Sequence, residues 1–357
     1  MPTNVTAEYK KAEQAFRQAR DLDERLACLK EMLRTIPKHK GTEHLQAGLK
    51  TRIKQLTDEL TGPKKGGSHA AALYAVRSEG AAQVCLIGPP NAGKSSLHAR
   101  LTGSHTEVRP YPYTTKLPVP GMLPFEDVHF QLVDLPPIST EYMEPWFGNA
   151  IERADAALLV VDLSDPGCVD QVIAIRARLA EKKIMLSEHW PGLATQRELA
   201  AIPLSVAQKD HEEENSDPFL IHLPTLLMAN KSDLDPDPDE VKVLEELLEV
   251  HFPAVATSAE TGQGIELLGA MLFRGLEIVR VYTKAPGRPA DRDRPFTVRR
   301  GATVLDVARL VHKDIARTLK FARLWGSGQF NGQHVGPDHQ VADRDVVELH
   351  AQQGGVP

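Results

Sequence analysis

The residues best suited to bind an anion are the eight from Gly88 to Ser95, GPPNAGKS. They follow the apolar run AQVCLIG and precede the helical pattern SSLHARLTG, so we expect a loop between a strand and a helix. In such a loop, backbone N–H groups and the positive end of the helix surround phosphate oxygens. Lys94 would reach the outer phosphates, and the Ser95 hydroxyl would bind Mg²⁺. A strand-to-helix turn with incidental glycines is the alternative.

Two further polar segments end apolar runs downstream. The segment Asn230 to Asp233, NKSD, follows TLLMA, and Ser258-Ala259-Glu260 closes AVATSAE. Open α/β sheets bind ligands at the carboxyl ends of their strands. The Asp233 carboxylate can accept from two donors on the edge of guanine, whereas adenine offers an acceptor at N1, so we expect GTP rather than ATP. The Ser258 loop can offer a backbone donor to the base oxygen; polar strand-ending turns are the alternative reading.

The elements that would position these residues fall into three blocks. Residues 1–72 predict two helices that meet as a hairpin, the second starting at Thr42, and then a Gly-rich linker. Residues 80–287 alternate short apolar runs with helical patterns, which predicts an α/β domain with a mostly parallel sheet, helices on both faces and a surface insertion near 190–222. Residues 293–352 predict a small α+β domain with short strands around one helix. The final helical pattern of the middle block covers residues 264–284.

Composition narrows the class of protein. The chain has 357 residues, 41% hydrophobic and 25% charged, which suits a globular protein of two or three domains. No window approaches 18 consecutive apolar residues, and the start MPTNVTAEYKKAEQ lacks the apolar region of a secretory signal, so we expect a cytoplasmic protein without membrane association. Cys28, Cys85 and Cys168 lack paired spacing, which predicts reduced structural thiols.

The net charge of −6 conceals two basic ends around an acidic middle. This pattern would suit a polyanionic partner such as RNA, and solvated helix faces explain it equally well. The second basic end contains residues spaced three or four apart around the predicted helix and its exit: Lys313, Arg317, Lys320 and Arg323. These side chains could contact RNA phosphates or simply face solvent. The histidines show no metal-ligand spacing, so we interpret His98, His251, His312 and His350 as surface or packing residues.

Taken together, the segments GPPNAGKSS, YPYTT, DLPP, NKSD and SAE resemble the five nucleotide motifs of the Obg and DRG (developmentally regulated GTP-binding) families of GTPases. The C-terminal segment HKDIARTLKFARLWGSG resembles a TGS domain, a ubiquitin-like module, and the N-terminal hairpin resembles the helical start of DRG proteins. The resemblance covers nearly the whole chain except the region near 190–222. It implies a P-loop GTPase domain between a helical hairpin and a TGS domain.

The resemblance also implies a role for individual residues. Thr115, the second threonine of YPYTT, would complete the Mg²⁺ shell and sense the γ-phosphate. Asp134 would hold Mg²⁺ through a water, with Ser95 as a direct ligand; a strand-end cap is the alternative for Asp134. The expected nucleotide-binding residues are Gly88, Pro89, Pro90, Asn91, Ala92, Gly93, Lys94, Ser95, Ser96, Thr114, Thr115, Asp134, Asn230, Lys231, Asp233, Ser258 and Ala259.

Catalysis would depend on Lys94, Thr115 and Asn91. Ile138 stands where Ras-like enzymes carry the glutamine that orients the attacking water, and isoleucine cannot do this by hydrogen bonding. The resemblance to GTPases with a hydrophobic residue here implies slow hydrolysis. Asn91 resembles the asparagine that coordinates K⁺ in potassium-stimulated GTPases, or else it only shapes the loop. Mg²⁺ is therefore the expected ion, and K⁺ is a second candidate that depends on the role of Asn91.

The stretch FQLVDLPPIS, residues 130–139, departs from the family pattern at one position. The families usually have Asp-x-Pro-Gly, whose glycine N–H donates to the γ-phosphate, and here Pro137 replaces that glycine. Proline has no N–H and a fixed φ. We therefore expect the second switch to discriminate poorly between GTP and GDP.

Two functions remain open from the sequence. The first is a molecular switch that binds GTP and GDP and acts on the ribosome, on RNA or on a companion protein factor, with no DNA expected. The second is a nucleotide-responsive adaptor that has lost most of its turnover. An ATP-using P-loop protein is disfavoured by Asp233.

Overall fold

The computed structural model covers residues 1–357 and describes residues 6–19, 22–37, 42–60, 74, 76–103, 117–162, 164–193, 219–234, 240–248 and 251–351. The chain divides into two compact units. One consists of Met1–Ala75 with Lys209–Ile221, and the other of Val76–Gln208 with His222–Pro357. Within the described ranges, every helix is too short or too polar to span a bilayer.

The described part of the first unit contains three helices, α1 (Ala7–Gln18), α2 (Leu22–Thr35) and α3 (Glu43–Leu60). The prediction of two helices is therefore wrong in one detail, because the first splits after Gln18. Ala19 is extended, with φ −67° and ψ 129°, and its N–H closes α1 by donating to Ala15. The apolar spacing continues across this break, so periodicity alone could not reveal it. The start of α3 after Thr42 agrees with the prediction.

The core of this unit includes a residue from a distant part of the chain. Tyr9, Leu29, Met32 and Leu49 are buried among the three helices, and Phe219 packs against the same cluster. A Cβ atom added at Gly48 would lie 2.9 Å from the Phe219 ring. The end of the predicted insertion therefore belongs to the helical unit. Residues 194–218, which include most of that insertion, lie outside the described residues.

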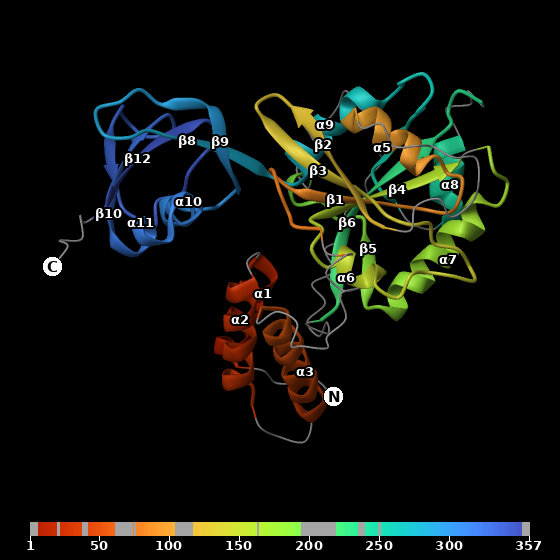
Figure 1. The fold of residues 1–357 in the computed structure, drawn as a ribbon, viewed down its shortest axis with the longest axis horizontal. Coiled ribbons are helices and arrows are strands. Elements are labelled where there is room, and N and C mark those ends of the chain that lie inside the picture. The colour runs from red at the N-terminus through yellow and green to blue at the C-terminus, as the bar shows by residue number, and fades with distance from the viewer. Residues whose placement is uncertain are drawn as a thin grey trace. The chain divides into compact units, whose positions relative to one another are not determined.

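A seven-stranded sheet forms the main layer of the second unit among the described residues (Figure 1). Its order is β2-β3-β1-β4-β6-β5, and β7 also pairs with β6. The strand β1 runs parallel to β3 and β4, and β6 runs parallel to β4 and β7, while β2 and β3 are antiparallel. The bounds are β1 Gln83–Ile87, β2 Val119–Phe125, β3 Val128–Asp134, β4 Ala156–Asp162, β5 Ile184–Ser187, β6 Ile221–Asn230 and β7 Ala254–Ala256. The predicted mostly parallel α/β sheet is confirmed.

Helices cover this sheet because its central strands are apolar on both faces. Leu97 of α5 (Lys94–Thr102) and Leu272 of α9 (Leu268–Gly275) share a core cluster with Leu86 and Leu158. The alternate strand residues, such as Ile87, are equally buried. The helix α7 (Cys168–Glu181) packs against β4, β5 and α8 (Glu240–Leu248). Short helical segments complete the unit: α6 Phe147–Ile151, η2 Pro191–Leu193 and η4 Ile265–Leu267.

Two strands of this sheet were not foreseen. The strand β2 contains Pro120, Gly121 and Pro124, residues that argue against a central strand. It lies at the edge of the sheet, where missing N–H donors are tolerated. The other, β5, is only four residues long. The sequence pattern missed β2 because of its prolines and glycine, and it missed β5 because that strand is short.

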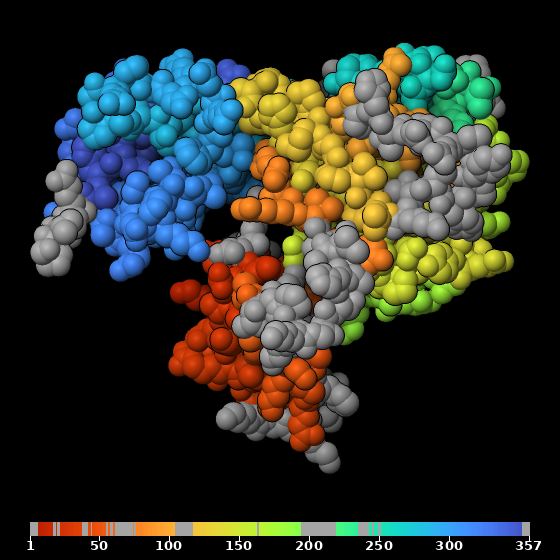
Figure 2. Space-filling model, in the orientation of Figure 1, coloured from red at the N-terminus to blue at the C-terminus, as the bar shows by residue number. Residues whose placement is uncertain are grey.

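A second sheet of five strands lies at the C-terminus of the described residues, in the order β11-β10-β12-β8-β9. Its strands are β8 Ile278–Thr283, β9 Asp291–Arg299, β10 Leu319–Trp325, β11 Gln333–Val335 and β12 Asp345–Ala351. The expected helix over residues 264–284 is wrong, because α9 ends at Gly275 and β8 follows as a strand of this sheet. The sheet thus begins before the boundary expected between residues 287 and 293. In the space-filling view its blue atoms lie against the yellow β2–β3 hairpin (Figure 2).

The helix predicted in this C-terminal domain is broken. It forms α10 (Val304–Val311) and α11 (Lys313–Thr318), separated at His312, whose extended backbone and Nδ1 atom cap α11 by accepting from the Asp314 N–H at 3.2 Å. The basic side chains predicted around the helix and its exit divide between a helix and a strand. Lys313 and Arg317 belong to α11, whereas Lys320 and Arg323 belong to β10.

Candidate functional site

The loop from Gly88 to Ser95 connects β1 to α5, as predicted, and its glycines are required by close contacts. Gly88 has φ +155°, and a Cβ there would lie 2.3 Å from the Val160 carbonyl oxygen. Gly93 has φ +87°, and a Cβ there would lie 2.3 Å from Nδ2 of Asn230. No side chain caps the start of α5 at Gly93. A loop without side-chain bulk at an uncapped helix start fits a phosphate group.

Lys94 is buried inside this loop, 6% exposed. Its ammonium group donates to the carbonyl oxygens of Gly88 at 3.1 Å and Pro89 at 2.8 Å. Burial lowers the pKa of Lys94 to about 8, although the negative charge of Asp134 opposes this shift. The loop therefore folds around its own cation, which is the charge that would meet the outer phosphates.

Ser95 and Asp134 meet beside the loop, although 39 residues separate them. The Ser95 hydroxyl donates to the Asp134 carboxylate at 2.6 Å, and Asp134 is fully buried at the end of β3. The pairing of β3 with β1 sets Asp134 opposite Leu86, directly before the loop. A hydroxyl and a carboxylate are the oxygen ligands that Mg²⁺ prefers, so this pair fits the ion. Thr114 and Thr115 lie outside the described residues.

Asn230 connects three of the predicted motifs. Its amide Nδ2 donates to the Ala92 carbonyl of the loop at 2.9 Å, and its Oδ1 accepts from the Ala259 N–H at 3.2 Å. The side chain is 1% exposed, so both contacts are shielded from water. Asn230 thereby fixes the carboxyl end of β6 against the phosphate loop and the Ser258-Ala259-Glu260 loop. Asp233 follows it and is exposed.

Lys231 has a partner that the sequence reading missed. Its ammonium lies 2.5 Å from the Asp162 carboxylate at the end of β4. The register of β4 with β6 sets Asp162 opposite Asn230. Burial opposes ionisation of Asp162, but hydrogen bonds from Lys231 and Ser164 outweigh it and hold its pKa below the ordinary value. The available signal was an acidic residue ending the apolar run AALLVVD.

The loop after β7 is ordered by its own polar groups. The Ser258 hydroxyl accepts from the Thr261 N–H at 3.0 Å, and the Ser258 N–H donates to the Gln263 carbonyl at 3.1 Å. Arg100 of α5 donates to the carbonyl oxygens of Glu260 at 3.4 Å and Thr261 at 3.3 Å. This loop is thus held against the helix that begins at the phosphate loop.

The segment after Asp134 is pinned along the phosphate loop. The Leu135 N–H donates to the Leu86 carbonyl at 3.3 Å, and the Ile138 N–H donates to the Gly88 carbonyl at 3.1 Å. Pro136 and Pro137 between them have no N–H to offer. Ile138 is fully buried. The backbone donors at both ends of the double proline are therefore committed to protein carbonyls.

The structure brings most of the predicted nucleotide site together at the carboxyl edge of the sheet. The loop from Gly88 to Ser95, Asp134, Asn230 and the Ser258 loop are joined by the contacts above. The histidines interpreted above as surface or packing residues take no part in these contacts. His98 is a buried packing residue with Nε2 3.3 Å from the Leu132 carbonyl, and burial lowers its pKa. Across the described ranges, His, Cys, Asp and Glu side chains form no cluster of three or more that could hold a metal.

Two family matches cover different parts of the chain. Residues 83–189 match the family described as 50S ribosome-binding GTPase, and residues 279–351 match the TGS domain. The first range contains β1, the phosphate loop and Asp134; the second begins within β8. The order of the two matches agrees with the order of the two sheets.

Relatives align over most of the chain. An uncharacterized GTP-binding protein of Methanocaldococcus jannaschii is 27% identical over 92% of this chain and 92% of its own length. Developmentally-regulated G-protein 1 of Arabidopsis thaliana is 28% identical over 89% of this chain and 88% of its own. Among solved structures, a GTP-binding protein of Pyrococcus horikoshii has a TM-score of 0.50 at 16% identity, covering 75% of this chain and 99% of that one, which supports the fold. The chain thus contains a GTPase domain and a C-terminal TGS domain, and it is similar over most of its length to developmentally regulated GTP-binding proteins.

Proposed function

We propose that this protein is a GTP-dependent molecular switch that hydrolyses GTP slowly and acts on the ribosome or on RNA. The observation that carries the nucleotide part is the joining of three motifs by Asn230, which contacts Ala92 and Ala259 at 2.9 and 3.2 Å. Parallel-sheet topology places these strand ends at one edge, and the two hydrogen bonds of the buried Asn230 amide then fix the three motifs to one another. Cytoplasmic localisation follows from the proposed partner.

The site residues have distinct roles in this proposal. Backbone groups from Gly88 to Ser96 hold the phosphates, with Lys94 supplying a cation. Mg²⁺ would be held by Ser95, by Asp134 through a water and by Thr115, and would supply charge neutralisation for the phosphates. Asp233 reads guanine, Ser258 and Ala259 border the base, and Lys231 is held in place by Asp162.

Slow hydrolysis follows from Ile138 and its surroundings. The side chain is fully buried, and its N–H is bound to Gly88 at 3.1 Å, so this residue has neither the group nor the position to orient a water. The hydrogen bond between the Ile138 N–H and the Gly88 carbonyl also favours the second candidate, a nucleotide-responsive adaptor with little or no turnover. The two candidates share the nucleotide site and differ in turnover and partner.

The ribosome part of the proposal is supported by the description of the matched family, 50S ribosome-binding GTPase, and by the TGS domain. The experiment combines affinities for GDP, GTP and ATP, steady-state GTP hydrolysis in K⁺ buffer, and co-sedimentation with ribosomal subunits under GDP or a GTP analogue. We expect guanine selectivity, slow turnover and nucleotide-dependent sedimentation. Protein binding in place of sedimentation, with turnover below detection, would favour the adaptor. Equal affinity for ATP and GTP would overturn both.

We expect K⁺ to accelerate hydrolysis severalfold over Na⁺ at matched ionic strength. Asn91 has φ +61° and is exposed within the phosphate loop, which suits a ligand for an ion beside the phosphates. A cation there would stabilise the charge that develops in the transition state. Replacing Asn91 by Ala should abolish the difference between the salts. Equal wild-type rates in K⁺ and Na⁺ would show that Asn91 only shapes the loop.

A further inference from the structure

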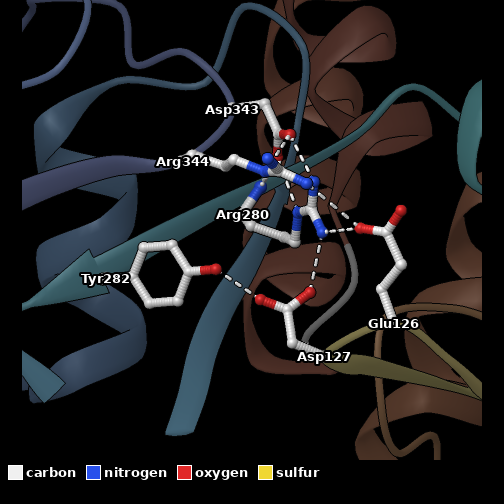
Figure 3. A network of polar contacts seen from close by, with 6 residues as sticks. All are labelled: Glu126, Asp127, Arg280, Tyr282, Asp343 and Arg344. Atoms are coloured by element: carbon white, nitrogen blue, oxygen red, sulfur yellow. Dashed lines mark hydrogen bonds and ion pairs between the residues drawn. The ribbon is translucent and has the colours of Figure 1, made fainter. Parts of the chain in front are cut away.

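Arg280 of β8 is the centre of a charged cluster outside the nucleotide motifs (Figure 3). Its side chain is only 4% exposed, yet it carries a full charge. Two bonds to the Asp343 carboxylate, from Nε at 3.0 Å and Nη2 at 2.6 Å, hold it within the TGS domain. The Arg280 N–H also donates to Asp343 at 2.8 Å. Contacts within the TGS domain alone therefore fix the position of the Arg280 side chain.

The remaining guanidinium nitrogen, Nη1, reaches the turn between β2 and β3 in the GTPase domain. It donates to Asp127 at 2.7 Å and to Glu126. The Tyr282 hydroxyl donates to the other oxygen of Asp127, and Arg344 donates to Glu126 at 3.3 Å. We call these six residues the Arg280 network: Glu126, Asp127, Arg280, Tyr282, Asp343 and Arg344. It joins the two domains through charge-assisted bonds, which are stronger than neutral ones; Arg280 is buried, whereas Glu126 is 49% exposed.

The turn is also anchored by apolar contacts. Phe125, the last residue of β2, lies 5.6 Å from Phe273 between ring centroids, and a Cβ at Gly269 would come within 2.5 Å of the Phe125 ring. The Arg280 guanidinium lies over Phe273, 4.8 Å from its centroid. The tip of the hairpin is therefore held between α9 and β8.

The hairpin connects this tip to the Mg²⁺ site of the proposed switch. Its register pairs Phe125 with Val128 at the tip and Val119 with Asp134 at the other end. Thr115 lies four residues before Val119, the first residue of the hairpin. A continuous two-stranded ladder therefore runs from the Arg280 network to Asp134. A displacement of the tip along the strands would move the backbone at Asp134.

We propose that Arg280 is a positioning residue that couples the TGS domain to the nucleotide site through the β2–β3 hairpin. This inference rests on the proposed switch. A partner that binds and displaces the TGS domain would change the rate of nucleotide release. Because coupling between two binding events is reciprocal, the bound nucleotide would in turn change the stability of the contact between the TGS domain and the hairpin. Arg280 touches no substrate and acts through the backbone that carries Asp134.

The test is the double variant Glu126→Gln/Asp127→Asn in the full chain. It removes the charges on the GTPase side and leaves the Arg280–Asp343 pair within the TGS domain intact. The variant should release fluorescent GDP at least about fivefold faster than wild type, the lower range of measured allosteric couplings. Amide hydrogen exchange in β8 should differ between GDP and a GTP analogue in the wild type, and this difference should disappear in the variant.

The control is Glu79→Gln/Asp338→Asn, which makes the same two types of substitution at exposed positions outside the network. It also removes two negative charges. It should match wild type in both measurements. Unchanged GDP release together with unchanged nucleotide-dependent exchange in the Glu126→Gln/Asp127→Asn variant would overturn the coupling. A wild-type protein that binds no guanine nucleotide would instead overturn the proposed switch. If the double variant does not fold, Arg280→Lys, which keeps the charge but loses the two-pronged contact to Asp343, should show a smaller acceleration; no acceleration would overturn the coupling.

The stabilising effect of the network should vanish at low pH. Burial alone would raise the pKa of Asp127 and of Asp343, but hydrogen bonds from Tyr282 and Arg280 to Asp127, and from Arg280 to Asp343, hold both pKa values below the ordinary range. Such a contribution is complete above the unfolded pKa of about 3.9 and is lost as pH falls through the lowered folded value. The difference in unfolding midpoint between wild type and Glu126→Gln/Asp127→Asn should therefore be constant above pH 5 and shrink toward pH 3. A constant difference down to pH 3 would contradict it.

Discussion

Replacing Asp233 by Asn should lower the affinity for GTP and GDP by about two to four orders of magnitude. The carboxylate can accept hydrogen bonds from both N1–H and the amino group of guanine, and a bond to a charged group contributes roughly 1.5–3 kcal/mol. Asparagine offers one acceptor and turns its N–H₂ toward a second donor. The position cannot drift to compensate, because Asn230 and Lys231 are held by Ala92, Ala259 and Asp162.

The specificity of Asp233→Asn should change as well as its affinity. Xanthine has a carbonyl where guanine has the amino group, so the asparagine N–H₂ could donate to it. Calorimetry with GTP, GDP and xanthosine triphosphate measures both effects. Asp338→Asn, the same substitution at an exposed position outside the nucleotide motifs, is the control and should keep wild-type affinity for GTP. Unchanged GTP binding by Asp233→Asn would mean that another group reads the base.

The places of the candidate nucleotide-binding residues in the fold could be predicted from the sequence because their motifs are local. The glycines, Lys94 and Ser95 lie within eight residues, and their geometry follows from one strand-to-helix turn. The convergence of Asn230 with that loop follows from the topology of a parallel sheet, whose carboxyl ends share one edge. Both predictions needed only the order of the elements.

The polar contacts between distant segments could not be predicted in this way. Lys231 and Asp162 are 69 residues apart, and Arg280 and Asp127 are 153 apart. Neither pair belongs to a spacing pattern, since each depends on strand register or on how two domains meet. A lone acidic residue in a turn, such as Asp127, looks like any solvated carboxylate until its partner is placed.

The misassigned elements have a similar cause. The run from Leu268 to Thr283 is apolar in both its helical and its strand part, and a buried strand resembles a buried helix when only hydrophobicity is compared. The sequence pattern did not reveal the strand that starts at Ile278, and the C-terminal sheet therefore starts earlier in the chain than expected. The prolines and the glycine of β2 argue against a central strand but are tolerated in an edge strand. Strand propensity does not distinguish these two positions, so the sequence did not predict β2.

Replacing Pro137 by Gly should raise the preference for GTP over GDP by about ten- to a hundredfold. The structure explains why the wild-type segment is poor in donors: the Leu135 and Ile138 N–H groups are bound to Leu86 and Gly88, and the two prolines between them have none. Glycine would add one N–H at the position that donates to the γ-phosphate in the related families. A hydrogen bond to a charged group contributes roughly 1.5–3 kcal/mol, which corresponds to the expected change.

The variants Pro137→Ala and Pro137→Gly separate the two properties that proline removes. Alanine restores the N–H but not the freedom of φ, whereas glycine restores both. If the donor alone limits GTP sensing, the two variants should show the same ratio of GDP to GTP dissociation constants. If the backbone must also reorient, only glycine should reach the full effect. Pro136→Ala, which adds an N–H one residue earlier, is the matched control and should leave the ratio unchanged.

Stability must be measured beside affinity, because glycine also increases the entropy of the unfolded chain. A lower unfolding midpoint with an unchanged GTP to GDP ratio would reflect that entropy and not nucleotide sensing. A Pro137→Gly protein that matches wild type in both relative affinity and turnover would contradict the role given to Pro137. Discrimination would then have to arise entirely from the segment that contains Thr115, and the double proline would serve only to hold Ile138 against the phosphate loop.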